Sequence, residues 1–177
     1  MKWDYEFDVV VVGSGNGALT SALCSHDGGA KTLVIEKSDQ YGGTSATSGG
    51  GVWIPNNRYA KAENVDDSDQ DARDYINSVS PKGKIKDELI ETYISEGPKM
   101  IDYLHDNSQV KYRNLAHYPD YFPDNPGGKE GNRSMEPEPI NGTQLGNDLG
   151  KLREQHPQTA FTMGPINMNF TQVEGQL

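Results

Sequence analysis

A glycine-rich hexapeptide, Gly13–Ala18 (GSGNGA), carries the clearest chemical signal in the chain. It matches the pattern G-x-G-x-x-[GA] through Gly13, Gly15 and Ala18. Gly13 permits a tight turn out of a strand, Gly15 lets the backbone approach a diphosphate, and the small Ala18 lets a helix pack closely. The free N–H groups at a helix start favour an anion. The hexapeptide therefore predicts a dinucleotide diphosphate site, formed by Gly13, Ser14, Gly15, Gly17 and Ala18.

An acidic residue follows at the distance that such a site requires. Glu36 lies 21 residues after Gly15, close to the expected spacing of about 20 residues. Its carboxylate would accept hydrogen bonds from ribose hydroxyls and would repel a 2′-phosphate. The alternative is that Glu36 is a solvated strand end. With the turn before it, we expect Glu36 to bind the ribose, and we include the adjacent Lys37 and Ser38 in the site.

The loop after Glu36 indicates which dinucleotide binds. The segment Tyr41–Gly51 contains five glycines and several hydroxyl side chains, and no charge follows Asp39 before the apolar stretch Val52–Pro55. Such a loop is often a flexible linker. Glycines also allow close approach to an extended cofactor, and hydroxyls suit its polar edge, which favours FAD over NAD. The expected FAD ligands here are Gly42, Gly43, Thr44, Ser45, Ser48, Gly49 and Gly50.

The elements around the hexapeptide form a βαβ unit. The β-branched run Phe7–Val12 predicts a strand buried on both faces, as in parallel sheets. Helical periodicity over Gly17–Ser25 follows, and Lys31–Glu36 predicts a second buried strand. A doubly wound sheet normally needs more strands than these two. We therefore predict an α/β fold, a Rossmann-like FAD-binding domain that is incomplete within residues 1–177.

Later segments predict helices and one strand. Ser68 is expected to cap a helix whose apolar stripe ends near Val79, with Asp71 completing a variant capping box. A second helix is expected over residues 86–96, where Gly97-Pro98 should break or kink it before it resumes over 99–106. Residues 110–113 suggest a short strand. No long element is predicted from residue 116 onward.

Two stretches carry a resemblance to a known family. Residues 8–57, which end EKSDQYGGTSATSGGGVWIPNN, resemble the FAD-binding start of the fumarate reductase and ketosteroid dehydrogenase superfamily. The doublet Gly42-Gly43, followed by Thr44-Ser45, and the later Trp53-Ile54-Pro55 are most similar to 3-ketosteroid Δ1-dehydrogenases. The segment HYPDYFPDNPGG, residues 117–128, also resembles that family.

The resemblance implies a reaction and a catalytic residue. In that family a hydride passes from C1 of a 3-oxosteroid to flavin N5, and a tyrosine takes the proton from C2. On this motif, Tyr121 is the active-site tyrosine beside the base, whereas Tyr118 is expected to be a packing aromatic. Tyr121 could also be a packing aromatic. The substrate domain and the closing FAD segment are expected to lie outside residues 1–177, so that this chain alone binds FAD weakly and is inactive.

Other functions remain possible at this point. They are alkene reduction of the fumarate type, a non-catalytic FAD-binding or electron-transfer module, and an NAD-dependent dehydrogenase. We expect a steroid-like substrate and an electron acceptor as partners. A net charge of −10 without a basic patch argues against nucleic acid.

Composition also bears on location and on metal binding. No apolar run approaches the about 20 residues of a membrane span. The start of the chain lacks a signal peptide, and the single Cys24, expected in the core, fits a reducing, cytoplasmic compartment. Four scattered histidines predict no metal site.

Overall fold

A computed structural model describes residues 3–154, 162–163 and 166–167. The chain divides into two compact units. Of the described residues, the first unit comprises 3–50, 140–154, 162–163 and 166–167, and the second comprises Gly51–Pro139.

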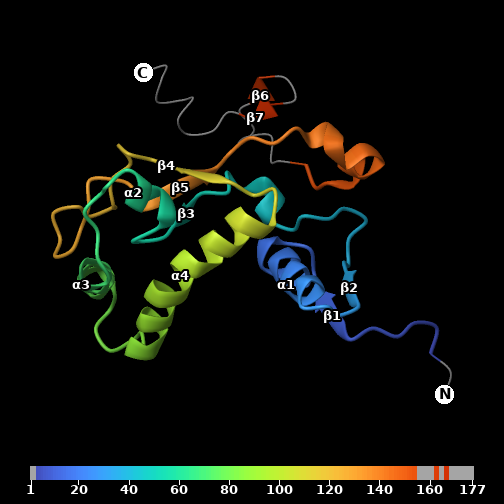
Figure 1. The fold of residues 1–177 in the computed structure, drawn as a ribbon, viewed down its shortest axis with the longest axis horizontal. Helices are drawn as coiled ribbons and strands as arrows, with labels where there is room; N and C mark the ends of the chain where they lie inside the picture. Colours follow the sequence, from blue (N-terminus) through green and yellow to red (C-terminus); the bar gives the residue numbers. More distant parts are fainter. Residues whose placement is uncertain (1–2, 155–161, 164–165, 168–177) are drawn as a thin grey trace. The chain divides into compact units, whose positions relative to one another are not determined.

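The first unit opens with the predicted βαβ arrangement. Strand β1 (Val9–Val12) leads into helix α1 (Asn16–Asp27), and strand β2 (Thr32–Ile35) follows. The two strands pair in parallel, with Val9 opposite Thr32 and Val12 opposite Ile35. Figure 1 shows α1 alongside both strands, in blue. The mixed helix and strand order and the parallel pairing confirm the predicted fold class.

The burial of this unit differs from the prediction. Val10 and Val12 are 52% and 79% exposed, so β1 is not buried on both faces. Only two strands form this sheet among the described residues, and α1 has no buried residue to cover them fully. Cys24 on α1, which has no buried residue, is exposed. The prediction that Cys24 lies in a core is therefore wrong.

The rest of the first unit consists of short elements. A 3₁₀ turn, η1 (Ser45–Thr47), lies in the glycine-rich loop. A 3₁₀ segment, η2 (Gly142–Lys151), precedes Leu152, which forms a parallel bridge with Tyr41. Strands β6 (Thr162–Met163) and β7 (Ile166–Asn167) pair antiparallel. The sequence did not predict these elements, because their segments are polar or rich in proline and glycine and lack hydrophobic periodicity.

A three-stranded antiparallel sheet and three helices make up the second unit. The strand order is β3 (Val52–Trp53), β5 (Ser134–Pro137) and β4 (Tyr112–Asn114). The helices are α2 (Arg58–Ala62), α3 (Asp69–Val79) and α4 (Asp87–Asn107), green to yellow-green in Figure 1. The strand predicted over 110–113 is thus found at Tyr112–Asn114, and β5 was missed.

Helix α4 passes through Gly97-Pro98 without a break, so the predicted break is wrong, whereas the kink stays a prediction. Gly97 is buried against Ile54, because a Cβ at Gly97 would lie 3.3 Å from Ile54 Cδ1. Ile94 before the proline and Ile101 and Leu104 after it are buried as well. Burying side chains of this size contributes about 1.5–3 kcal/mol each, which offsets the amide hydrogen bond lost at Pro98.

Helix α3 begins as predicted. The Ser68 side chain accepts a hydrogen bond from the Asp71 N–H at 3.1 Å, and its hydroxyl donates to the Asp71 carboxylate at 2.9 Å. Ala72 and Tyr75 of the predicted stripe are buried, whereas Val79 at the helix end is 41% exposed. Among the described residues, no helix combines the length and the apolar character of a bilayer span.

Candidate cofactor site and aromatic pocket

The glycine turn joins β1 to α1 in the first unit. Gly13 has φ +97°, a left-handed conformation that favours glycine, and its N–H donates to the Ile35 carbonyl at 2.7 Å. Gly15 is the N-cap of α1 and has no side chain with which to cap it. The first N–H groups of α1 therefore start at the turn, where an anion would meet them.

Ser14 connects the turn to both of the other predicted parts of the site. Its buried hydroxyl donates to Glu36 Oε2 at 2.5 Å and accepts from the Gly42 N–H at 3.0 Å. The Ser38 N–H donates to Glu36 Oε1 at 3.1 Å. The hydrogen bond from Ser14, and then that from Ser38, lowers the pKa of the Glu36 carboxyl below its usual value. Glu36 therefore remains a carboxylate at neutral pH, able to accept bonds from ribose hydroxyls.

The glycine-rich loop folds onto the turn. A Cβ at Gly43 would lie 3.3 Å from Gly15 Cα, and Gly43 has φ +56°. The Ser45 hydroxyl accepts from the Asn16 N–H at 3.0 Å. Gly42, Gly43 and Ser45 are thus brought together with the glycine turn, as their prediction as cofactor ligands requires.

The remaining predicted ligands bond within their own segments. Lys37 is exposed, and the Ser38 hydroxyl donates to Asp39. The Thr44 carbonyl accepts from the Thr47 hydroxyl, and the Ser48 hydroxyl accepts from the Gly50 N–H. Gly49 lies between these two residues in the chain. For these positions, cofactor binding stays a prediction.

Two glycines of the turn leave room that the described residues do not fill. A Cβ at Gly15 would meet only the Ser45 hydroxyl, at an ordinary contact distance of 3.4 Å, and φ at Gly15 is −73°. A Cβ at Gly17 would meet nothing within 4 Å. Neither packing nor backbone conformation demands glycine at these positions. Close approach of a ligand explains both, so the residues present fit a bound diphosphate.

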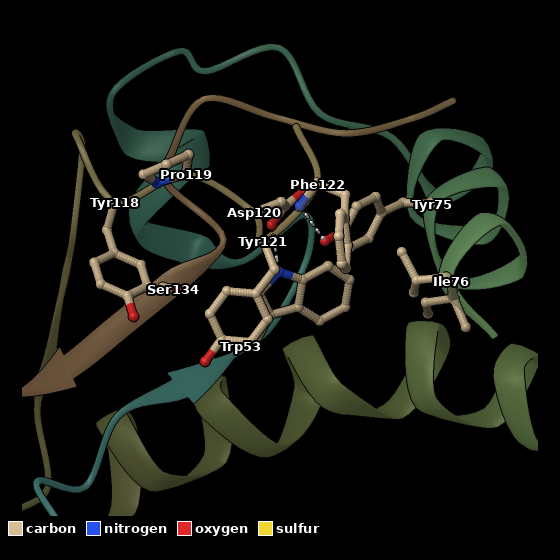
Figure 2. Close-up of a pocket in the computed structure, with 10 residues that line it drawn as sticks. Trp53, Tyr75, Ile76, Tyr118, Pro119, Asp120, Tyr121, Phe122 and Ser134 are labelled. Carbon is tan, nitrogen blue, oxygen red and sulfur yellow. Dashed lines mark hydrogen bonds between the residues drawn. The ribbon is translucent and has the colours of Figure 1, made fainter. Parts of the chain in front are cut away.

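The second unit contains a pocket of about 310 Å³ whose walls are mainly aromatic. Figure 2 shows Tyr75 and Phe122 on one side of the Trp53 indole and Tyr118 on the other, with the Tyr121 ring overlapping the indole in this view. The pocket lining is Trp53, Tyr75, Ile76, Val79, Tyr118, Pro119, Asp120, Tyr121, Phe122 and Ser134. Tyr121, the predicted catalytic residue, is 84% exposed. Apolar walls with a few hydroxyls suit a largely apolar ligand.

The two tyrosines of the segment influence one another. Partial burial, and then the charge and hydrogen bond of Tyr121, raise the pKa of the Tyr118 phenol. Tyr118, which the sequence suggested was a packing aromatic, thus lines the same pocket as Tyr121, which also influences the pKa of its phenol.

Glycines hold the segment that carries Tyr121 against its neighbours. A Cβ at Gly127, where φ is +72°, would lie 2.0 Å from the Asp71 carbonyl oxygen on α3. At Gly128 it would lie 2.3 Å from the Pro123 carbonyl oxygen, and at Gly131 2.0 Å from that of Ala116. Close backbone packing therefore explains the Gly-Gly doublet of this segment.

Sequence reasoning missed most of the pocket walls. Trp53, Tyr75 and Ser134 come from β3, α3 and β5, at no common spacing. The only signal at Trp53 and Tyr75 was aromatic character within segments predicted for other reasons, and Ser134 lies in β5, which the sequence did not predict. Metal ligation was not predicted, and no group of three or more histidine, cysteine or acidic side chains among the described residues could hold a metal ion.

Comparison with known proteins identifies the family. Residues 8–170 match the family described as FAD binding domain. The chain belongs to this FAD-binding family. FAD is the cofactor of the family, as the loop after Glu36 suggested.

Known relatives of this FAD-binding chain are much longer. It is 38% identical to the 3-oxosteroid 1-dehydrogenase of Mycolicibacterium smegmatis, over 95% of this chain and 29% of that protein. It is also 38% identical to the 4-oxocyclohexanecarboxylate 2-dehydrogenase of Sinomonas cyclohexanicum, over 89% and 27%. The crystal structure of the 3-ketosteroid Δ1-dehydrogenase of Sterolibacterium denitrificans, in complex with 1,4-androstadiene-3,17-dione, aligns with a TM-score of 0.85 and 40% identity, over 93% and 29%. The chain thus spans less than a third of each relative.

Proposed function

We propose that the protein is an FAD-dependent dehydrogenase that introduces a C1–C2 double bond into 3-ketosteroids. The observation that carries this proposal is the aromatic pocket that Tyr121 lines, because its walls suit a bulky apolar ring system. The similarity to 3-oxosteroid 1-dehydrogenases, over nearly the whole chain, supports the same substrate class.

In this proposal the first unit holds the cofactor. Gly13, Gly15, Gly17 and Ala18 hold the diphosphate at the start of α1, and Glu36 accepts hydrogen bonds from the ribose. Ser14 fixes Glu36 and Gly42 relative to the turn. Lys37 and Ser38, with the loop residues Gly42, Gly43, Thr44, Ser45, Ser48, Gly49 and Gly50, line the cofactor. When bound, FAD supplies the acceptor for the hydride.

Tyr121 has the proposed role of helping to take up the substrate proton. An unperturbed phenol has a pKa of about 10, so a tyrosine that accepts a proton near neutral pH needs stabilisation of its phenolate. The raised pKa of Tyr118 keeps that neighbouring phenol protonated. Tyr118 can therefore donate a hydrogen bond to a Tyr121 phenolate, which is the stabilisation required.

The charge of the pocket discriminates between ketosteroids and small dicarboxylates such as fumarate. Asp120 is its only charged lining residue, and Arg133 already pairs with that carboxylate at 2.9 Å. A carboxylate ligand would find no unpaired cation among the lining residues. The apolar ketone is therefore the preferred substrate.

The organisation and location of the whole protein are also proposals. Residues 1–177 would supply the amino-terminal part of an FAD-binding domain, with the substrate domain and the closing FAD segment elsewhere in the protein. An electron acceptor would reoxidise the flavin. The single cysteine of the chain supports a cytoplasmic location.

The test is an assay of the full-length protein with androstenedione and a dye acceptor. We expect dye reduction that depends on the steroid, with a 1,4-diene-3-one product detected by mass spectrometry. Replacing Tyr121 with Phe should lower kcat at least tenfold. Dye reduction that ignores the steroid, or faster reoxidation of reduced viologen with fumarate, would contradict the proposal.

A further inference from the structure

Asp120, directly before Tyr121, is anchored through both its side chain and its backbone. Its carboxylate accepts hydrogen bonds from Trp53 Nε1 at 2.6 Å, from Arg133 Nη1 at 2.9 Å and from the Lys129 N–H at 3.0 Å. Its own N–H donates to the Lys129 carbonyl at 3.0 Å. The Asp120 side chain is 2% exposed, whereas Tyr121 is 84% exposed. The fixed point of this segment is therefore the residue beside Tyr121.

Arg133 completes a buried ionic cluster behind the pocket wall. Its side chain is 1% exposed and pairs with Asp120 on one side and with Asp67, at 2.6 Å, on the other. The guanidinium carbon lies 5.4 Å from the Trp53 ring centroid and 5.7 Å from that of Tyr75. A buried ion pair adds little net stability compared with apolar packing, although removing one partner is costly. We therefore expect this cluster to contribute chiefly by fixing the positions of the Asp120 carboxylate and the Arg133 guanidinium.

Trp53 transmits this geometry to the pocket. Its indole N–H is fixed by Asp120, and its ring packs against Tyr75, with 5.8 Å between centroids, and against Tyr93, with 6.3 Å. Figure 2 shows the indole forming one wall of the pocket, with the hydrogen bond to Asp120 dashed. The orientation of this wall thus depends on a single carboxylate.

We propose that Asp120 is a positioning residue for the aromatic pocket. It orients the Trp53 indole through its carboxylate and places Tyr121 through the backbone. Arg133 pairs with that carboxylate and helps to fix it among its donors. The kinetic part of the test rests on the proposed function, but the spectroscopic part does not.

The spectroscopic test follows hydrogen exchange of the tryptophan indole groups in the full-length protein, labelled with ¹⁵N-tryptophan. The variants Trp53→Phe and Trp3→Phe identify the indole signals of Trp53 and Trp3 by their loss. Trp3 is 76% exposed, so we expect its indole N–H to exchange at least tenfold faster than that of Trp53. Asp120→Asn should speed Trp53 exchange at least tenfold and move its signal upfield, because a neutral acceptor replaces a carboxylate. Unchanged Trp53 exchange in folded Asp120→Asn would overturn the proposal.

The kinetic test is a double-mutant cycle on Asp120 and Trp53 with a 3-ketosteroid as substrate. Asp120→Asn should raise KM at least fivefold and also lower kcat, because both the wall and Tyr121 move. Trp53→Phe should raise chiefly KM. The double variant should have a KM within twofold of that of Asp120→Asn, since Asp120 acts through Trp53 on this quantity. If the fold-changes in KM of the two single variants instead multiply in the double variant, the proposal is overturned.

A matched control removes an ion pair that lies away from the pocket lining. Arg73 pairs with Glu91 at 2.5 Å, and Arg73→Gln should leave KM and kcat within twofold of the parent values. If Asp120→Asn does not fold, Trp53→Phe alone decides, because a KM within twofold of the parent overturns the proposal. If the parent protein turns over no 3-ketosteroid, the proposed function fails, and indole exchange still decides whether Asp120 positions Trp53.

Discussion

Replacing Gly127 with alanine tests how the segment that carries Tyr121 is seated on α3. The new Cβ would lie 2.0 Å from the Asp71 carbonyl oxygen and 2.9 Å from the Tyr75 amide nitrogen, both backbone atoms of a helix. A non-glycine residue in the left-handed region costs about 1–2 kcal/mol. Overpacking against atoms that cannot rotate away adds typically about 1–3 kcal/mol or more. We therefore expect Gly127→Ala to destabilise this unit by about 2–5 kcal/mol.

Gly83 offers a matched control in the same unit. Its φ is +69°, close to the +72° of Gly127, but a Cβ there would meet nothing within 4 Å. Gly83→Ala should therefore cost only the backbone term of about 1–2 kcal/mol. The difference between the two variants isolates the close approach of the segment to α3.

The assay is urea unfolding of parent and variants, followed by tryptophan fluorescence. We expect a clearly lower unfolding midpoint for Gly127→Ala than for Gly83→Ala, and steroid turnover that falls only in the first. Equal midpoints for the two variants would refute the reasoning, because they would mean that the segment does not pack on the helix backbone.

Two further predictions concern hydrogen bonds at the two sites. Ser14→Ala leaves the buried Gly42 N–H without its acceptor, at a cost of about 1–3 kcal/mol, and should lower the melting temperature. The pKa of Glu36 is lowered in the folded state, so the Ser14 bond stabilises the fold above the ordinary pKa, and this contribution disappears as pH falls through the lowered value. The melting difference between parent and Ser14→Ala should therefore narrow in acid, and a constant difference would contradict this explanation. Tyr121→Phe removes one of the causes that raise the pKa of Tyr118, so a spectrophotometric titration should find that phenol ionising at lower pH; an unchanged titration would show that the two phenols do not interact.

The first unit was predictable because its signals are local. Gly13, Gly15 and Glu36 occur at spacings set by one turn, one helix and one strand, so sequence alone could indicate both the parallel pairing and the cofactor. What sequence could not show is the role of Ser14. Its hydroxyl joins two residues that are 22 and 28 positions away, and nothing in a single serine indicates such a link.

The second unit was less predictable because its contacts are long-range. Pro98 suggested a broken helix, but packing of Gly97 on Ile54 keeps α4 continuous. The buried pairing of Arg133 with Asp67 spans 66 residues, and no local pattern marks it. Tyr121 was found only through resemblance to a family, since its proline-rich segment has no periodicity.

The central claim is that the glycine turn holds the FAD diphosphate. The most direct test titrates the FAD-free full-length protein and its Gly15→Ala variant with FAD. We expect the fold to tolerate a methyl group at Gly15, because the nearest atom to the new Cβ would be the Ser45 hydroxyl oxygen, at 3.4 Å. If the turn holds the FAD diphosphate, the variant should bind FAD at least tenfold more weakly while its melting temperature without FAD changes by no more than a few degrees. Equal FAD affinity for parent and variant would contradict the account.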